Sequence, residues 1–413
     1  MVQANQRKSA AGSPAASGAG AYGLSADTVS RGRYALIAPL ARGGMADVHL
    51  ARDTATGAEV VIKRVRKDLP ADAGYDRLLV AEAQLTRSLR HPNVVDVLDH
   101  GRDGATSEPF IVLEYVAGLD LHQLLRVCSR RKIRLPLALR LAVVTGLLSG
   151  VAYVHRARDG DGRPFDIVHR DISPANVLVS FDGRVKLCDF GIATATVMPD
   201  VPATSGIEGK ASYMSPEQAR GEPLDGRSDV YSVGVLLWEM LAGRRMRKKQ
   251  GTTSRLVRAA RGEVPPLSVR GFEGEAELHA IVRRALAVDR EDRFRSAAEL
   301  REALMRWGER PGCEVGDARA LRLFLAAELS EVRREQRAVR DRACAEVDPN
   351  VWRPDADDDR ATPSHSGPRR RRAVTTVPSS PRRDRRWVIA AAAAAAALAS
   401  YGIASAVQYL LLG

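Results

Sequence analysis

Apolar residues along this chain form several distinct patterns. Residues 57–65 are rich in valine and isoleucine and follow a glycine turn, which predicts a β-strand. Leucines recur at helical spacing in residues 72–89, and apolar residues again follow one side of a predicted helix in residues 316–347. Residues 388–412 form a long apolar stretch without any charge. We therefore expect strands, amphipathic helices and one segment of membrane-spanning length.

Composition divides the chain into a folded centre and two biased ends. Residues 1–30 are mainly Ala, Gly and Ser, which predicts a disordered arm without a secretory signal peptide. Residues 354–381 mix Pro, Ser and Arg and lack a hydrophobic run, which favours a disordered linker. The predicted organisation is an arm (1–33), the main folded domain (34–307), a helical extension (308–350), a basic linker (351–386) and a transmembrane helix (387–412).

Candidate chemistry lies in two short strings near the middle of the chain. His169-Arg170-Asp171 is followed by Asn176, and Asp189-Phe190-Gly191 comes shortly after. In phosphoryl transfer from Mg-ATP, one carboxylate accepts the proton of the substrate hydroxyl, while an asparagine and a second carboxylate hold magnesium. Asp171, Asn176 and Asp189 have the order and spacing of those three groups, so the pattern predicts a protein kinase.

A kinase also needs a lysine that meets the α- and β-phosphates and a helical glutamate that holds this lysine. Lys63 lies in the predicted strand at residues 57–65. Glu82 is the only glutamate in the predicted helix at residues 72–89. We therefore predict an ion pair between Lys63 and Glu82. A solvated strand lysine is the alternative for Lys63 taken alone.

Residues 34–307 resemble the bacterial Hanks-type Ser/Thr protein kinases. This resemblance implies an α+β, bilobal fold with a small antiparallel β N-lobe, a helical C-lobe and ATP in the cleft between them. Besides the residues above, it rests on five further strings: Arg42-Gly43-Gly44-Met45-Ala46-Asp47-Val48, Glu114-Tyr115-Val116, Tyr213-Met214-Ser215-Pro216-Glu217-Gln218, Ser228-Asp229-Val230-Tyr231-Ser232-Val233-Gly234 and Asp292-Arg293-Phe294.

The resemblance also implies roles for single residues. Asp171 would be the catalytic base, assisted by Lys63 and Glu82, and Asn176 and Asp189 would bind Mg²⁺. Leu113 would be the gatekeeper, Glu217 would pair with Arg293, and Asp229 would brace the catalytic loop. The implied ATP contacts are Leu40, Gly43, Gly44, Val48, Lys63, Glu114, Val116, Asn176 and Asp189.

A few positions depart from the family pattern. Ala41 and Ala46 stand where two loop glycines are expected, although two glycines remain at the tip of the loop. Ser173 replaces a lysine that ordinarily touches the γ-phosphate, and Lys210 replaces a threonine that lines the substrate site. The alternative reading is therefore a pseudokinase scaffold that binds partners without turnover. A tyrosine kinase is less favoured, because the catalytic loop lacks the A-A-R-N or R-A-A-N signature.

The segment between Asp189 and Glu217 carries candidate regulatory hydroxyls. In kinases of this kind, an arginine at the position of Arg170 docks a phosphate on the activation loop and so orders that loop. We predict phosphorylation at Thr204 or Ser205, with ordinary polar loop residues as the alternative.

The C-terminal apolar stretch is predicted to span a membrane. As a helix, residues 388–412 would extend about 38 Å, enough for a hydrocarbon core of about 30 Å. Eight arginines lie just before it, so the positive-inside rule keeps the kinase domain cytoplasmic in a single-pass protein of the cell membrane. Only Gly413 follows the span, so no external sensor domain is expected. Small residues along the span would permit a homodimer.

Two clusters of basic residues bear on the predicted partners. The arginines before the span contribute to a net charge of +13 and would attract anionic lipid headgroups. A nucleic-acid partner is disfavoured, because no aromatic residues interleave with them. Within the kinase domain, the basic cluster at residues 244–249 is expected to be a solvated loop. Protein substrates and the membrane are therefore the predicted partners.

Overall fold

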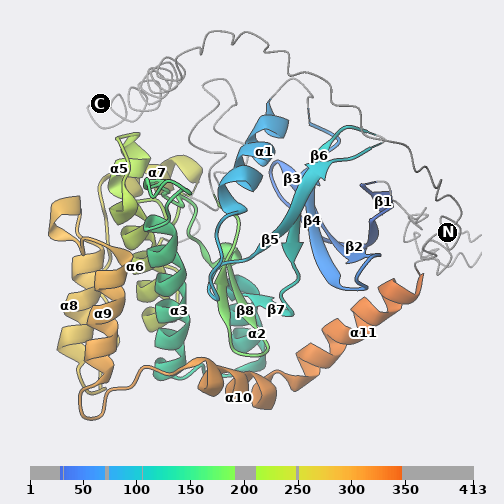
Figure 1. Cartoon of the computed structure of the whole chain (residues 1–413). Helices are drawn as coiled ribbons and strands as arrows, with labels where there is room; N and C mark the ends of the chain where they lie inside the picture. The colour runs from blue at the N-terminus through green and yellow to red at the C-terminus, as the bar shows by residue number, and fades with distance from the viewer. Residues whose placement is uncertain are drawn as a thin grey trace, which may run out of the picture.

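The computed structural model describes residues 28–30, 32–69, 74–104, 106–190, 211–247 and 251–346. In these ranges a β-rich N-lobe is followed by a larger helical C-lobe, so the predicted bilobal fold is confirmed (Figure 1). Several predicted features lie outside the described residues. They are most of the arm, the basic linker, the transmembrane helix, Thr204, Ser205 and Lys210.

The N-lobe is one antiparallel sheet in the order β1-β2-β3-β4-β6-β5. Its first strand lies inside the segment that composition assigned to the arm. Val29 of β1 is buried and pairs with Tyr34, so the folded domain begins earlier than predicted. The strands are β1 (Thr28–Val29), β2 (Tyr34–Arg42), β3 (Ala46–Asp53), β4 (Glu59–Val65), β5 (Val97–Arg102) and β6 (Pro109–Glu114).

Helix α1 (Tyr75–Thr86) packs against the sheet of the N-lobe. It begins after Gly74, whose φ of 74° lies in the left-handed region that glycine adopts without strain. Leu78, Leu79, Glu82 and Ala83 are buried. Leu79 and Ala83 pack in one cluster with residues of β5 and β6. The leucine spacing therefore decides which way Glu82 faces.

The C-lobe is built around α3 (Leu137–His155) and α6 (Gly226–Ala242), which pack against each other. Among the described residues, α3 is long and apolar enough to cross a membrane, but 67% of its apolar window is buried as a core helix. The remaining elements are β7 (Gly118–Asp120), α2 (Leu121–Arg131), η1 (Pro174–Asn176), β8 (Val177–Ser180), β9 (Val185–Leu187), α5 (Pro216–Arg220), α7 (Thr252–Ala260), α8 (Glu275–Ala285), η3 (Arg290–Asp292) and α9 (Ala297–Gly308).

Two helices, α10 (Ala318–Glu328) and α11 (Ser330–Glu346), follow the C-lobe. Leu321, Leu325 and Leu329 are buried in the C-lobe core, and the amide of Gly316 donates to the carbonyl of Ala138 at 2.9 Å. This part of the extension therefore packs on the C-lobe.

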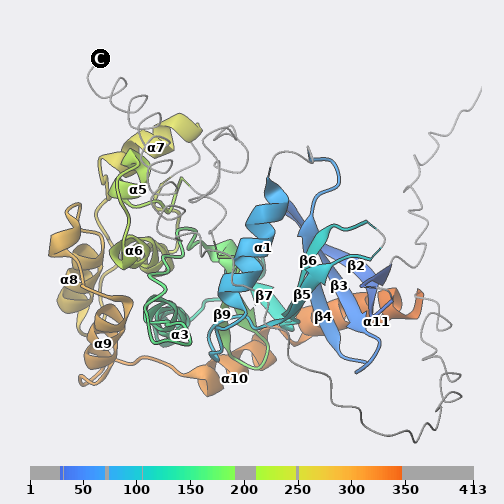
Figure 2. The same ribbon diagram turned by 45° about the horizontal axis from the view of Figure 1, so that its top comes forward.

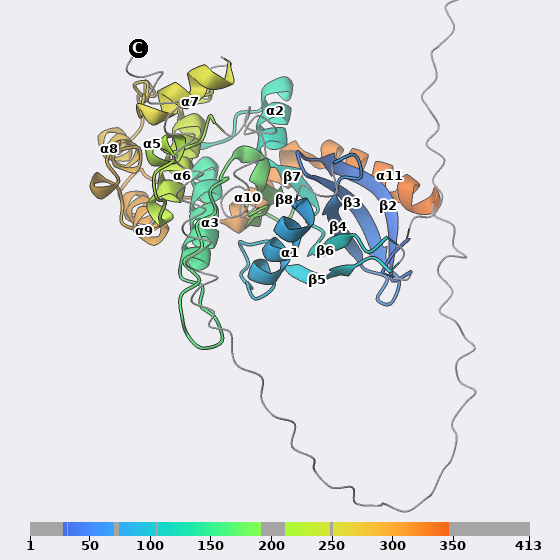
Figure 3. The ribbon, with the colours of Figure 1, turned by 90° about the horizontal axis from the view of Figure 1, so that it is seen from above.

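Helix α11 continues from the C-lobe to the N-lobe, which the sequence did not indicate. It runs beside the sheet, on the side away from α1 (Figures 2 and 3). Near its start, Arg131 of α2 lies 2.8 Å from Glu331. Near its end, Arg340 lies 3.2 Å from Glu59 of β4. The extension therefore contacts both lobes, by apolar burial at one end and by a partly exposed charge pair at the other.

Leu325→Ala is expected to lower the free energy of unfolding by about 2 to 5 kcal/mol, because it leaves a cavity in a packed core. Leu325 is 2% exposed, whereas Leu323 on the same helix is 56% exposed. Leu323→Ala is therefore the matched control and should change stability by less than about 1 kcal/mol. Urea denaturation of both variants checks this, and equal losses would contradict the packing of α10 on the C-lobe.

Candidate active site

Lys63 lies at the centre of a buried charge cluster between the lobes. Its ammonium donates to Glu82 Oε1 at 2.7 Å and to Asp189 Oδ1 at 2.9 Å. The side chains of Lys63 and Glu82 are each only 8% exposed. Burial alone would lower the pKa of Lys63, but the carboxylates of Asp189 and Glu82 outweigh it and raise that pKa. The lysine is therefore held as a cation at the position predicted for binding phosphates.

The three members of this cluster come from three separate elements. β4 supplies Lys63, α1 supplies Glu82, and the segment after β9 supplies Asp189. Thr86 Oγ1 donates to the main-chain carbonyl of Glu82 at 2.6 Å, within the last turn of α1. The ion pairs form only when α1 and both lobes are placed correctly.

Asp171 and Asn176 are joined within the catalytic loop. The amide nitrogen of Asn176 donates to the main-chain carbonyl of Asp171 at 2.8 Å and to its Oδ2 at 3.0 Å. This fixes the orientation of the Asn176 amide, because nitrogen and oxygen lie on opposite sides of the group. The amide oxygen is thereby turned away from Asp171.

Asp229 of α6 holds the backbone just before the catalytic aspartate. Its carboxylate accepts from the main-chain amides of His169 at 2.7 Å and Arg170 at 2.9 Å, and lies 2.7 Å from His155 Nε2. Burial raises the pKa of Asp229, but hydrogen bonds and charge from His155 and His169 outweigh burial and lower that pKa. Asp229 therefore remains ionised while fully buried.

Two residues of the site have a backbone conformation that is uncommon outside glycine. The φ angle is 65° at Arg170 and 54° at Asp189. Left-handed conformations are strained for most L-residues and concentrate at functional sites. At Arg170 the strain is offset by the hydrogen bond from its amide to Asp229.

The residues predicted to bind magnesium suit that ion. Mg²⁺ prefers hard oxygen ligands and is commonly held by one or two protein side chains together with phosphates and water. Asn176 offers an oriented amide oxygen, and the carboxylate of Asp189 is 44% exposed. The donor set therefore fits Mg²⁺ bound beside a nucleotide.

The predicted nucleotide contacts lie on the β2–β3 turn, on β3 and in the segment after β6. Val48 of β3 pairs directly with Lys63 of β4, and Leu40 of β2 is exposed near the turn. The amide of Gly43 donates to the carbonyl of Ala46 at 2.8 Å. Neither Ala41 nor Ala46 has a positive φ. The two alanines therefore fit this turn without backbone strain.

The side chain of Glu114 ties the connection between the lobes to the C-lobe. Glu114 Oε1 accepts from the amide of Asp96 at 2.8 Å and forms a hydrogen-bonded ion pair with Lys186. Lys186 of β9 is buried, and sequence reasoning did not identify it. Because its partner is 72 residues away, no local pattern could have revealed it. Val116 follows in the same connection and is partly buried.

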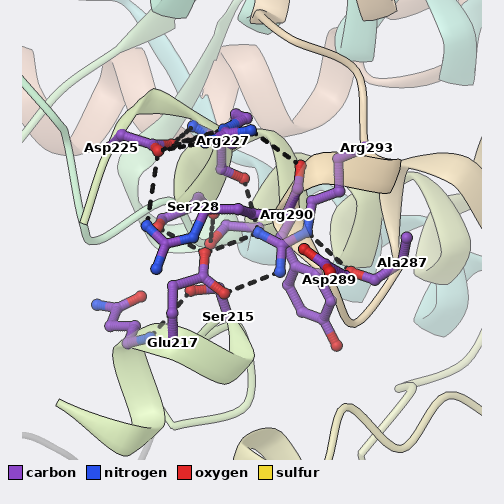
Figure 4. A network of polar contacts seen from close by, with 12 residues as sticks. Ser215, Glu217, Asp225, Arg227, Ser228, Ala287, Asp289, Arg290 and Arg293 are labelled. Carbon is purple, nitrogen blue, oxygen red and sulfur yellow. Dashed lines mark hydrogen bonds and ion pairs between the residues drawn. The ribbon is translucent and has the colours of Figure 1, made fainter. Parts of the chain in front are cut away.

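A second buried ion pair, between Glu217 and Arg293, anchors the start of α5. Both guanidinium Nη atoms of Arg293 donate to the carboxylate of Glu217, at 2.7 and 2.8 Å, and Ser228 donates to the same carboxylate (Figure 4). The Arg293 side chain also donates to main-chain carbonyls of Ala287 and Arg227. Burial alone would raise the pKa of Glu217, but these hydrogen bonds lower it to about 2.

The sequence predicts a solvated loop for the basic cluster at residues 244–249, but one of its arginines is buried. Arg247 is buried and 2% exposed, whereas Arg244 and Arg245 are exposed. Residues 248 and 249 lie outside the described ranges. The prediction was therefore wrong for Arg247, because its partners are distant in sequence.

Comparison with known proteins agrees with this geometry. Residues 34–304 match the model of the protein kinase domain family. The chain is 42% identical over 276 residues to a probable serine/threonine-protein kinase of Streptomyces coelicolor, covering 65% of this chain and 39% of the relative. It is 37% identical over 277 residues to the tyrosine-protein kinase MasK of Myxococcus xanthus, covering 66% and 42%.

A solved structure shares the fold. The PknI kinase domain of Mycobacterium tuberculosis aligns with a TM-score of 0.52 at 26% identity, covering 69% of this chain and 98% of that domain. The match to the curated relatives, by contrast, spans about two fifths of their length.

Glu217→Gln is expected to remove part of the acid sensitivity of folding. The pKa of Glu217 is lowered from 4.5 to about 2. Its ionised form therefore stabilises the fold above pH ~4.5, and this contribution is lost as the pH falls from there through about 2. The shift corresponds to roughly 3 kcal/mol of unfolding free energy.

Urea denaturation between pH 7 and pH 3 measures this effect. The stability difference between the natural chain and Glu217→Gln should shrink as the pH falls. Glu302→Gln, at an exposed position of α9, is the control. If the difference in unfolding free energy between the natural chain and Glu217→Gln stays constant with pH, ionisation of Glu217 does not contribute to stability.

Proposed function

Because this chain belongs to the protein kinase family, we propose that it transfers the γ-phosphoryl group of Mg-ATP to Ser and Thr hydroxyls of proteins. One observation carries the proposal. Lys63 is hydrogen bonded at the same time to Glu82 and to Asp189, beside the linked pair Asp171 and Asn176. These five residues are the groups expected for phosphoryl transfer, apart from the lysine that Ser173 replaces.

In this mechanism each residue of the chain has a separate task. Lys63, held by Glu82, orients the α- and β-phosphates. Asn176 and Asp189 would hold Mg²⁺, which when bound neutralises charge on the β- and γ-phosphates. Asp171 orients the acceptor hydroxyl and takes its proton, and its position relative to Asn176 is fixed by the hydrogen bonds described above.

The choice of acceptor is supported by the catalytic loop and by most of the relatives. The loop Asp171-Ile172-Ser173-Pro174-Ala175-Asn176 lacks the tyrosine-kinase signature. The relatives matched include proteins named as serine/threonine-protein kinases and one named as a tyrosine-protein kinase. We propose Ser and Thr, and phosphoamino-acid analysis of labelled product distinguishes the two classes.

We also propose that the kinase is tethered to a membrane with its catalytic domain in the cytoplasm. Support comes from the uncharged apolar residues 388–412 and the arginines that precede them. A transmembrane helix there would place the enzyme near membrane-bound substrates, and the small residues along it would permit a homodimer. Phosphorylation of Thr204 or Ser205 would then be a means of regulation within such a pair.

Asp171→Asn is expected to abolish autophosphorylation, because the amide cannot accept the proton of the hydroxyl. The test uses labelled ATP with a chain that ends at residue 346. This chain keeps Leu321, Leu325 and Leu329, which belong to the C-lobe core. Label on Ser or Thr in the natural sequence, absent from the variant, supports the proposal, and mapping the label tests Thr204 and Ser205.

Two outcomes of this test would contradict the proposal. Label that persists in Asp171→Asn would remove that residue from its role as the base. No label in the natural sequence, with both Mg²⁺ and Mn²⁺ tried and ATP binding confirmed, would favour the pseudokinase scaffold. In that case Ala41, Ala46 and Ser173 would be the first positions to revert to the family residues.

The full chain is expected to remain in the membrane fraction of expressing bacteria after a high-salt wash. A chain ending at residue 386 should be released by that wash, because its arginines bind lipid only through screened charge. Immunoblotting of the two fractions measures the difference. Release of the full chain by salt would contradict a transmembrane helix and would leave only electrostatic attachment.

A further inference from the structure

The buried guanidinium of Arg247 holds the chain segment at residues 211–214. One Nη atom donates to the main-chain carbonyls of Ser212 at 2.8 Å, Met214 at 3.2 Å and Ala211 at 3.4 Å. The other donates to the hydroxyl of Tyr231 on α6 at 3.1 Å. A single side chain therefore connects three neighbouring carbonyls to a helix of the C-lobe core.

This arrangement needs a specific explanation, because burying a cation is costly unless it is paired or well hydrogen bonded. In the described part of the chain, no carboxylate forms an ion pair with Arg247. Its partners are instead carbonyl and hydroxyl oxygens. The planar fork of arginine can reach several such acceptors at once, which a lysine ammonium on a flexible stem does less well. The guanidinium therefore fixes the relative positions of these three carbonyls.

Tyr231 lies close to both arginines that hold this part of the chain. Its ring lies 6.0 Å from the guanidinium carbon of Arg247 and 4.9 Å from that of Arg293. Arg293 in turn pairs with Glu217. Both ends of the segment from residue 211 to residue 217 are therefore fixed to the same side chain of α6.

The segment held in this way lies next to the catalytic loop. It leads into α5, where the side-chain amide of Gln218 donates to the carbonyl of Arg170 at 2.8 Å. Arg170 immediately precedes Asp171, which under the proposed function takes the proton of the acceptor hydroxyl. Residues 211–217 are thereby tied to the residue that precedes Asp171, so a substrate chain whose hydroxyl reaches Asp171 would lie beside this segment.

We infer that Arg247 is a positioning residue for the protein substrate. It fixes the backbone at residues 211–214 in the conformation against which the substrate chain lies. This inference rests on the proposed kinase function and deepens it. Arg247 makes no contact with Lys63, Glu82, Asn176 or Asp189. Replacing Arg247 should therefore raise KM for the protein substrate without raising KM for ATP.

The test compares three variants of the full chain in steady-state kinetics. Arg247→Met keeps the length of the side chain and removes all of its donors, and Arg247→Lys keeps the charge without the fork. Arg244→Met is the matched control from the same loop, because Arg244 stacks on Trp238 at 4.7 Å and does not contact residues 211–214. Dephosphorylated casein and the Asp171→Asn chain serve as protein substrates.

Arg247→Met should raise KM for the protein substrate by about tenfold or more, since several hydrogen bonds to a charged donor are lost. KM for ATP should stay within about twofold of the natural chain, because the nucleotide contacts lie elsewhere. Arg247→Lys should restore part of the difference, and Arg244→Met should match the natural chain in both constants.

The outcomes separate this inference from the proposed function. If the natural chain transfers no phosphate to either substrate, the proposed function fails. If the natural chain is active but both Arg247 variants keep its KM for protein, or raise the two KM values together, the inference is overturned. Thermal unfolding is measured for each variant, and if Arg247→Met does not fold, Arg247→Lys decides the question by the same two constants.

Discussion

The ammonium of Lys63 is the group on which the rest of the site depends. It is almost fully buried, and its charge is tolerated because two carboxylates lie within 3 Å. One carboxylate belongs to α1 of the N-lobe and the other follows β9 of the C-lobe. Removing either partner would leave a buried cation insufficiently paired. The position of α1 and the relation between the lobes are therefore energetically linked to this lysine.

Helix α6 performs the corresponding task within the C-lobe. Asp229 near its start binds the amides of His169 and Arg170, and so shapes the catalytic loop. Tyr231, two residues later, lies between Arg247 and Arg293 and fixes the segment that includes Glu217. Because residues two apart point to different sides of a helix, one short stretch of α6 can align two separate parts of the site. Helix α6 thus helps to position both Asp171, the proposed proton acceptor, and residues 211–214, against which the substrate is proposed to lie.

The extension after the C-lobe adds a second connection between the lobes. Its first helix contributes leucines to the C-lobe core, whereas α11 meets the N-lobe through the partly exposed pair Arg340 and Glu59. Apolar burial of this kind stabilises by several kcal/mol, whereas partly exposed ion pairs contribute about 1 kcal/mol or less. The contact of α11 with the N-lobe is consequently the weaker of the two.

The sequence by itself identified the candidate residues for the proposed chemistry and the helix that carries Glu82. Asp171, Asn176 and Asp189 are recognisable because their roles require fixed residue types at fixed spacing, and the leucines of α1 reveal its buried side through local periodicity. Tertiary structure alone decided that Arg247 and Lys186 are buried, that Val29 joins the sheet, and that α11 reaches the N-lobe. The physical reason is that burial of a charge, or pairing of a short strand, depends on partners far away in the chain. A local pattern records what a residue can do, whereas its surroundings decide which of these possibilities is realised.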